Sequence, residues 1–130
     1  MTVDDLKMLK LRGDKIPSIT AYDYSFARLA EMAGVDIILV GDSLGNVVLG
    51  HDTTIPVSMN DMMHHTRATA RGIQKRLLIA DMPFLSYATP TDAISNAAKL
   101  MQAGAHMVKL EGGQWLGETV HQLLQRGIPV

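Results

Sequence analysis

The chain has 130 residues, with 12 Lys and Arg against 13 Asp and Glu, so its formal net charge is −1. Hydrophobic residues at 47% and charged residues at 19% are typical of one globular domain or part of one, and they exclude a disordered polyelectrolyte. Near-neutral charge without a basic block argues against a nucleic-acid partner, and the lack of Cys excludes a disulfide framework, a thiolate zinc site and a Cys nucleophile.

Four short apolar runs along the chain have the composition of β-strands. They are rich in β-branched and aliphatic residues and almost continuously hydrophobic, which is the pattern of strands covered on both faces in a parallel sheet. In chain order, the four predicted strands are Ile16–Thr20, Val35–Val40, Leu77–Ala80 and His106–Leu110.

Helices are predicted before and between these runs, because capping residues mark their starts and glycines follow their ends. The predicted starts are at Thr2, at Asp23 or Ser25, at Ser58, at Thr89 and at Trp115, with the closing glycines Gly13, Gly34, Gly72, Gly104 and Gly127. Asp61, three residues after Ser58, fits a capping box, and Pro90 fits the first helical position after Thr89. Trp115 is expected to anchor the last helix.

The order of elements is therefore one helix, four βα units and Ile128–Val130 as the start of a fifth strand. This alternation predicts an α/β fold with a parallel sheet and right-handed crossovers. A (β/α)8 barrel needs about 250 residues, so we expect a truncated barrel with open sheet edges. The alternative is a complete small α/β domain with four or five strands.

No stretch is apolar over the roughly 20 residues that a membrane-spanning helix requires. The segment Met1–Asp5 lacks the basic and long apolar regions of a secretory signal. We therefore expect a cytoplasmic protein without a membrane partner.

Charged residues follow three neighbouring predicted strands where each strand ends. Asp42 follows the second strand, Asp81 the third, and Lys109 and Glu111 end the fourth. Ligands bind at the carboxyl ends of strands in parallel α/β folds. The connection after the second predicted strand, Gly41–Pro56, is also long for a βα loop, which favours a functional role.

Strand parity places Lys109 and Glu111 on one face, so both are expected to point inward if either does. Three converging carboxylates would repel each other unless a cation sits among them, and oxygen ligands favour Mg²⁺. The alternatives stay open: each Asp can be a helix cap or turn residue, Lys109 can be a structural ion-pair partner, and Ser43 can form a simple turn.

Seven motifs in order resemble the ketopantoate hydroxymethyltransferase family over about Thr2 to Val130. They are Ile19–Asp23, Val40–Gly45, Gly50–Asp52, Pro56–Val57, Ala80–Phe84, Tyr87–Pro90 and Val108–Gly113. The resemblance implies a (β/α)8 TIM barrel related to the phosphoenolpyruvate mutase and isocitrate lyase group. Residues 1–130 would then form the N-terminal half of one barrel domain.

The resemblance also implies roles for five residues. Asp42, Asp81 and Glu111 would surround Mg²⁺, while Ser43 and Lys109 would hold the 2-oxo acid, with Asp42 and Asp81 also at the substrate. The implied reaction transfers a one-carbon unit from 5,10-methylenetetrahydrofolate to the small-molecule substrate 3-methyl-2-oxobutanoate, giving 2-dehydropantoate for pantothenate biosynthesis.

No residue of the chain matches the family's general base, a glutamate expected beyond Val130, so we expect little or no turnover by this chain alone. The family also implies a homo-oligomer. Two rival interpretations remain: a Mg²⁺-dependent lyase or mutase of 2-oxo acids from the same barrel group, or a non-catalytic half-barrel fragment.

Overall fold

Four parallel strands form one sheet in the order β1-β2-β3-β4, as the alternation of elements predicts. The computed structural model describes all residues from 1 to 130. The strands are β1 (Ser18–Thr20), β2 (Ile37–Val40), β3 (Leu77–Asp81) and β4 (Met107–Lys109). Three of them are shorter than the predicted runs, whereas β3 extends one residue further, to Asp81. Each strand pairs in parallel with its neighbour in sequence.

The helices alternate with these strands, again as predicted. They are α1 (Val3–Arg12), α2 (Tyr24–Ala33), α3 (Leu44–Val47), α4 (Met59–Ala70), α5 (Pro90–Gln102), the 3₁₀ turn η1 (Gln114–Leu116) and α6 (Gly117–Gln125). None of these helices combines the length and the apolar character needed to cross a bilayer.

The predicted capping residues occupy the helix ends. The Ser58 hydroxyl accepts from the Asp61 N–H while an Asp61 carboxylate oxygen accepts from the Ser58 N–H, which is a capping box. Asp23, rather than Ser25, caps α2. Gly13 ends α1 with φ 76°, a left-handed conformation that favours glycine. Local hydrogen bonding therefore fixes where these helices begin and end.

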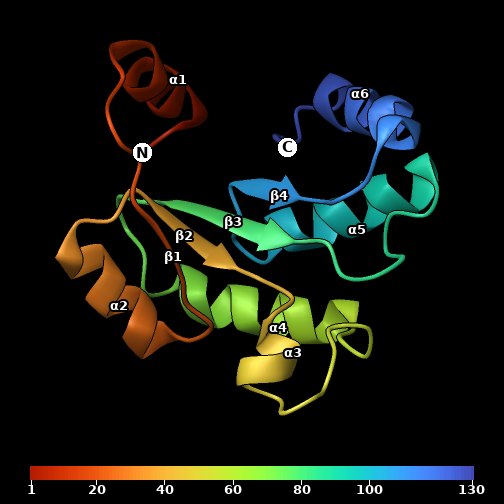
Figure 1. The fold of residues 1–130 in the computed structure, drawn as a ribbon, viewed down its shortest axis with the longest axis horizontal. Helices are drawn as coiled ribbons and strands as arrows, with labels where there is room; N and C mark the ends of the chain where they lie inside the picture. Colours follow the sequence, from red (N-terminus) through yellow and green to blue (C-terminus); the bar gives the residue numbers. More distant parts are fainter.

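The core lies between one face of the sheet and the helices packed on it. Figure 1 shows α2 and α4 below the sheet and α5 and α6 next to β4, with α1 apart from them near the start of β1. Leu123 of α6 belongs to the same core. Ile38, Val40 and Leu78 point toward the helices and are completely buried in this core. The residues that alternate with them point to the opposite face of the sheet, which we call the inner face. The alternation explains why the runs read as continuously apolar, because the inner face is apolar as well.

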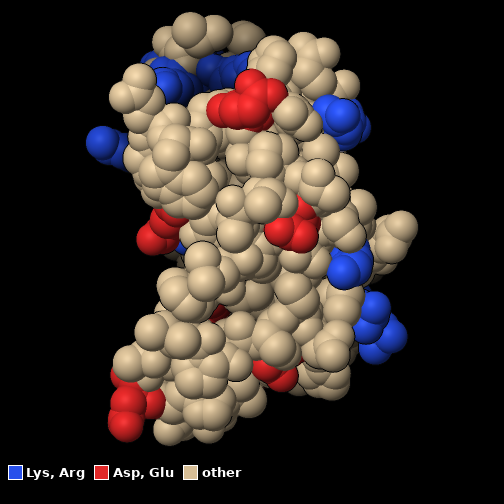
Figure 2. All heavy atoms as spheres, turned by 90° about the vertical axis from the view of Figure 1, so that its right-hand side faces the viewer, with Lys and Arg blue, Asp and Glu red and all other residues tan.

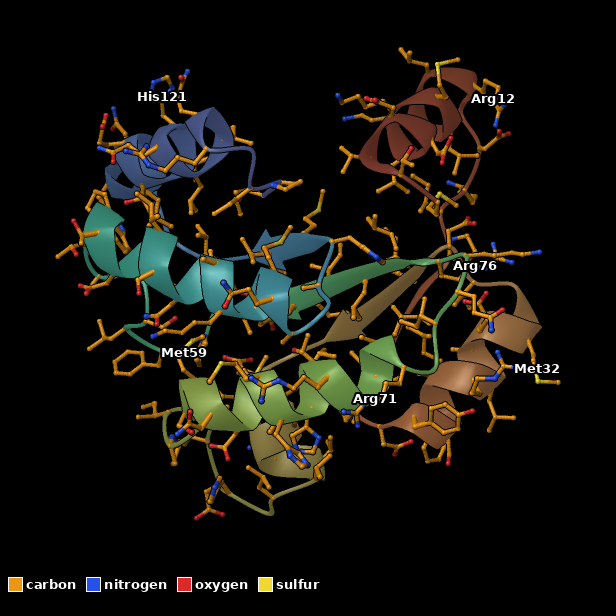
Figure 3. All side chains as sticks on the ribbon, turned by 180° about the vertical axis from the view of Figure 1, so that it is seen from behind. Arg12, Met32, Met59, Arg71, Arg76 and His121 are labelled. Carbon is orange, nitrogen blue, oxygen red and sulfur yellow. The ribbon has the colours of Figure 1, made fainter.

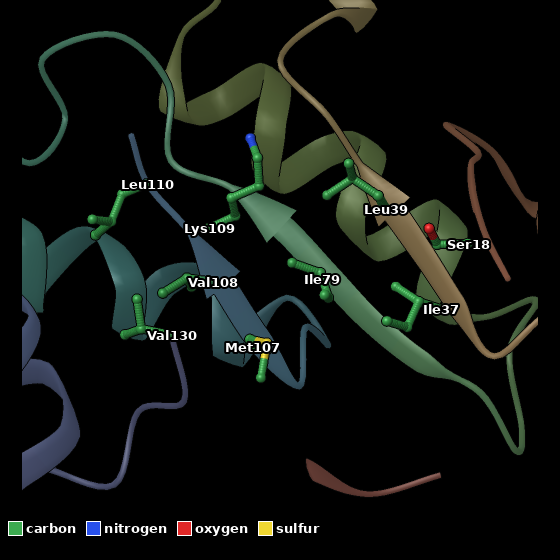
Figure 4. Close-up of a pocket in the computed structure, with 9 residues that line it drawn as sticks. All are labelled: Ser18, Ile37, Leu39, Ile79, Met107, Val108, Lys109, Leu110 and Val130. Carbon is green, nitrogen blue, oxygen red and sulfur yellow. The ribbon is translucent and has the colours of Figure 1, made fainter. Parts of the chain in front are cut away.

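The inner face lines a hollow of about 290 Å³, shown in Figure 4. Ile37, Leu39 and Ile79 form its floor together with Met107, and Lys109 stands at its edge. Lys109 thus shares the inner face with Met107, as strand parity predicts.

Three sequence-based expectations differ from the structure. The connection after β2 contains the unpredicted helix α3, whose first residues make no side-chain cap. The segment Ile128–Val130 is not a strand, although the Val108 N–H donates to the Pro129 carbonyl at 3.0 Å. Trp115 does not anchor a helix by burial: it lies in η1 and is 60% exposed, because the buried side chain of that turn is Leu116.

The capping box of α4 predicts a stability effect. Replacing Ser58 with Ala removes one acceptor for the orphan amides of the helix and should lower the free energy of unfolding by about 1 kcal/mol. Urea denaturation of the purified chain measures it. The matched control is Ser95→Ala at an exposed position inside α5, where an equal loss would show that the cap contributes nothing specific.

His106 predicts a pH effect on stability. Burial lowers its pKa from the ordinary histidine value, and its Nδ1 lies 2.9 Å from the Leu78 N–H, so this nitrogen must accept and stay unprotonated. As pH falls below about 6.5, the unfolded chain binds a proton that the folded chain resists, so the free energy of unfolding falls.

His106→Asn retains an acceptor but does not titrate. Urea denaturation at pH 7.5 and pH 5.5 should show a smaller acid destabilisation in this variant than in the wild type. The control is His121→Gln on the outer surface of α6, a position labelled in Figure 3. Equal acid sensitivity in the wild type and in His106→Asn would contradict the assignment.

Candidate active site

The register between β3 and β4 brings Asp81 and Lys109 together. Their Cα atoms are direct partners in the sheet, and Lys109 Nζ lies 2.7 Å from Asp81 Oδ1. Asp81 is only 5% exposed, whereas the Lys109 side chain is 41% exposed. A buried carboxylate needs a charged or hydrogen-bonding partner, so this ion pair makes the burial of Asp81 possible.

Asp42 joins this pair from the end of β2. Its N–H donates to Asp81 Oδ2 at 3.1 Å, so both carboxylate oxygens of Asp81 are engaged and oriented. Gly41 makes the approach possible, because a Cβ there would lie 2.9 Å from Ser43 Oγ and 3.4 Å from Asp81 Oδ2. Burial first, and then the charges of Asp81 and Glu111, raise the pKa of the Asp42 carboxyl, against the opposing charge of Lys109.

Glu111 reaches the cluster from outside the sheet. It lies two residues beyond the end of β4, its side chain is 77% exposed, and its Oε1 is 2.9 Å from Lys109 Nζ. This hydrogen bond and the charge of Lys109 lower the pKa of Glu111. Burial opposes the charged form of Lys109, yet hydrogen bonds to Asp81 and Glu111 raise its pKa overall. Lys109 is therefore the cationic centre of the cluster.

The donor chemistry of the cluster suits a hard cation. Its acidic groups offer only oxygen, and Asp42 feels the excess negative charge of its neighbours, which a divalent ion would relieve. No group of three His, Cys, Asp or Glu side chains lies close enough here to hold an ion jointly, because Lys109 lies between Asp81 and Glu111. Mg²⁺ often uses one or two carboxylates with waters, so a shared ion stays a prediction.

Ser43 is held by residues to which the sequence analysis gave no role. Its Oγ lies 2.9 Å from the Tyr22 hydroxyl, and the Tyr22 carbonyl lies 2.7 Å from Nδ1 of His65 on α4. Thr69, one turn further along α4, donates to the Ala21 carbonyl at 3.3 Å. Tyr22 lies two residues after the end of β1, as Asp42 lies two residues after the end of β2, so the strand-end argument that found Asp42 could also have found Tyr22.

Figure 2 views the molecule toward the carboxyl ends of the strands. The surface on this side is mostly uncharged, with acidic and basic side chains in separate small patches. Local pairing within the cluster, rather than a broad field of one sign, therefore governs the electrostatics of the candidate site.

Comparison with known proteins confirms the family resemblance. The family model described as ketopantoate hydroxymethyltransferase matches residues 1–130. The 3-methyl-2-oxobutanoate hydroxymethyltransferase of Shewanella denitrificans is 60% identical over 130 residues, covering 100% of this chain and 49% of the relative. That of Erwinia tasmaniensis is 57% identical over 129 residues, covering 99% and 49%. The chain thus spans about half the length of the curated relatives it matches.

Solved structures confirm the fold class. A 2,3-dimethylmalate lyase described as a PEP mutase/isocitrate lyase superfamily member matches with TM-score 0.70 and 18% identity, over 98% of this chain and 50% of that chain. A phosphonopyruvate hydrolase solved with oxalate and Mg²⁺ matches with TM-score 0.67 and 22% identity, over 83% and 38%. At these identities the likeness shows the fold alone, about half of a (β/α)8 barrel. The match of the family model to all 130 residues shows that the chain belongs to the ketopantoate hydroxymethyltransferase family.

Proposed function

We propose that this chain carries the metal-binding and 2-oxo-acid-binding half of a 3-methyl-2-oxobutanoate hydroxymethyltransferase. The observation that supports it is the gathering of Asp42, Ser43, Asp81 and Lys109 at the carboxyl ends of three adjacent strands. The whole reaction joins 3-methyl-2-oxobutanoate, 5,10-methylenetetrahydrofolate and water, and it yields 2-dehydropantoate and tetrahydrofolate.

Lys109 and Ser43 bind the carboxylate of the 2-oxo acid in this proposal. The Lys109 ammonium is partly exposed at the edge of the hollow, where it can offset a negative charge that approaches from solvent. The Tyr22 hydroxyl can donate to Ser43 Oγ, which leaves the Ser43 O–H free to donate to the substrate. Asp81 keeps the Lys109 side chain in position.

Asp42, Asp81 and Glu111 are the Mg²⁺ ligands of this proposal, with Asp42 and Asp81 also next to the substrate. Because the three side chains are not close enough here to hold an ion jointly, the ion would contact one or two of them directly and reach the rest through water. When bound, the ion supplies Lewis-acid polarisation of the keto group, which makes the C3–H bond of the substrate more acidic. The apolar floor formed by Ile37, Leu39 and their neighbours lies below the cluster and would place no charged group beneath the reacting carbon.

The general base that takes the C3 proton is predicted outside residues 1–130, so this chain alone should exchange that proton slowly at most. The rival activity, a Mg²⁺-dependent lyase or mutase of 2-oxo acids, would use the same cluster without folate. Dependence of product formation on 5,10-methylenetetrahydrofolate separates the two activities.

A homo-oligomer and a cytoplasmic location remain part of the proposal. Apolar side chains of α2 support the oligomer, because Phe26, Leu29 and Met32 are all more than half exposed. Met32 points away from the body of the molecule in Figure 3. Exposed apolar side chains grouped on one helix are typical of a protein contact.

The carboxylates can be tested in a chimera that joins residues 1–130 to the remaining half of the Shewanella denitrificans relative, which is 60% identical over this segment. The readout is Mg²⁺-dependent exchange of the C3 proton of 3-methyl-2-oxobutanoate into D₂O, followed by NMR. Asp42→Ala and Asp81→Ala should each lower the rate at least about 100-fold, the typical cost of removing one electrostatic group from an active site.

Asp4→Ala, at an exposed acidic residue on α1, is the control and should exchange like the parent chimera. Undiminished exchange in both Asp42→Ala and Asp81→Ala would refute the roles of these carboxylates. No exchange in the parent chimera would contradict the proposed function itself.

Tyr22 can be tested in the same chimera. Tyr22→Phe removes the hydroxyl that orients Ser43 and should raise the KM for 3-methyl-2-oxobutanoate by about 3- to 10-fold, the worth of one hydrogen bond. The Tm should change little, because the ring is kept. Tyr24→Phe, at an exposed tyrosine two residues further along the chain, is the matched control. Equal KM values for the two variants would exclude the positioning role of Tyr22.

A further inference from the structure

Two aromatic rings lie side by side in the loops that follow β3 and β4. The rings of Tyr87 and Trp115 are nearly parallel, with an interplanar angle of 12° and centroids 6.4 Å apart. Offset stacking at this separation is a favourable arrangement of aromatic side chains. Residues 28 positions apart in the chain thus form one small surface, which we name the Tyr87–Trp115 platform.

The platform is held in place by local contacts. The Tyr87 hydroxyl donates to the Glu111 carbonyl at 3.1 Å. Gly112 permits close packing beside it, because a Cβ there would lie 2.9 Å from the Trp115 ring and 2.5 Å from Leu116. Tyr87 is therefore oriented before any ligand arrives, which lowers the entropic cost of binding.

The platform is nevertheless open to solvent. Trp115 is 60% exposed, and the loop after β3 adds Phe84 at 55% and Leu85 at 62%. Leu85 also has φ 57°, a left-handed conformation that is unusual for a residue with a branched side chain. Neither of the two hollows in the structure is lined by Tyr87 or Trp115, so a ligand would stack on an exposed aromatic ring there and would not enter a cavity.

One residue connects the platform to the charged cluster. The Glu111 carbonyl accepts from Tyr87, while Glu111 Oε1 lies 2.9 Å from Lys109 Nζ. A molecule stacked on the platform would therefore lie next to a 2-oxo acid held by Lys109. A one-carbon transfer requires this proximity, because the methylene carbon must come within bonding distance of C3 of the acid.

We propose that the Tyr87–Trp115 platform binds the bicyclic pterin ring of the one-carbon donor by stacking, with the donor's methylene carbon toward Lys109. This inference rests on the proposed function, which requires a reduced folate, and it names the surface that receives it. A flat heteroaromatic ring gains dispersion and quadrupole interactions on an exposed tryptophan face that water cannot supply.

The first test uses residues 1–130, in which Trp115 is the single tryptophan and therefore the only source of tryptophan fluorescence. The probe is 5-formyltetrahydrofolate, with N-acetyltryptophanamide as the correction for light absorption. We expect saturable quenching by this probe and none by p-aminobenzoylglutamate, which lacks the pterin ring. The proposal would be overturned if 5-formyltetrahydrofolate gave no quenching or unsaturable quenching, or if p-aminobenzoylglutamate quenched equally.

Variants of Tyr87 provide the matched comparison. Tyr87→Leu should weaken binding of 5-formyltetrahydrofolate about 10-fold, because it removes one stacked ring, whereas Tyr87→Phe keeps the ring and should retain most of the affinity. Tyr24→Leu, at an exposed tyrosine of α2, should bind like the wild type. A Tyr87→Leu variant with wild-type affinity would overturn the proposal.

The second test separates this inference from the proposed function. In the chimera with the Shewanella denitrificans relative, Trp115→Leu should raise the KM for 5,10-methylenetetrahydrofolate about 10-fold, with a much smaller effect on C3-proton exchange, which needs no folate. An unchanged KM would refute the platform. A loss of C3-proton exchange as large as the effect on KM would also refute it, because that result indicates a structural role for Trp115. A parent chimera that lacks exchange would count against the proposed function, while the quenching experiment still decides the platform.

Discussion

The ion pair between Asp81 and Lys109 is the contact on which the rest of the candidate site depends. A parallel register makes the two residues direct partners on neighbouring strands, so their side chains leave the sheet at the same height. Without Lys109, the buried Asp81 would stand near the carboxylates of Asp42 and Glu111 with no compensating charge, which is costly at low dielectric. The lysine therefore allows acidic groups to gather at the end of the sheet before any cation is bound.

The outer helix α4 supports this site from a distance. His65 and Thr69 lie one turn apart on the helix and bond to the successive carbonyls of Tyr22 and Ala21, just beyond the end of β1. Tyr22 then meets Ser43, which follows Asp42 in the loop after β2. Buried backbone carbonyls need partners, and α4 provides them while it fixes the strand-end loop. The contacts of α4 with the loop after β1 thus position Tyr22, and Tyr22 orients the Ser43 hydroxyl.

Much of the fold was predictable because its signals are local. Caps such as Thr2 and Ser58 form hydrogen bonds to residues three positions away. Along β2 every second residue is buried in the core, and the residues between them are apolar as well because they line the hollow. The short helix α3 was not predicted, since its four residues show no periodicity and Ser43 makes no side-chain cap. Its stability comes from burial of Leu44 against distant parts of the chain, which a local pattern does not report.

The site was predictable to the same extent. Asp42, Asp81 and Lys109 end or directly follow strands, so topology alone brings them together. Parity does not fix Glu111, because β4 ends at Lys109 and the next residues leave the sheet. The exposed Glu111 side chain contacts the cluster through its ion pair with the Lys109 ammonium.

Lys109 also lies at a boundary between two environments. Below it on the inner face are apolar side chains, including Ile79 and Met107 (Figure 4). Its ammonium contacts the carboxylates of Asp81 and Glu111 at the strand ends. An anion that reaches this edge would meet a positive charge backed by apolar surface, where attraction is stronger than in bulk water. β4 thus provides both Met107, which is part of the apolar floor, and the charge above it. This layering follows from the alternation of Met107, Val108 and Lys109, in which a single-residue shift of register would send the ammonium into the core.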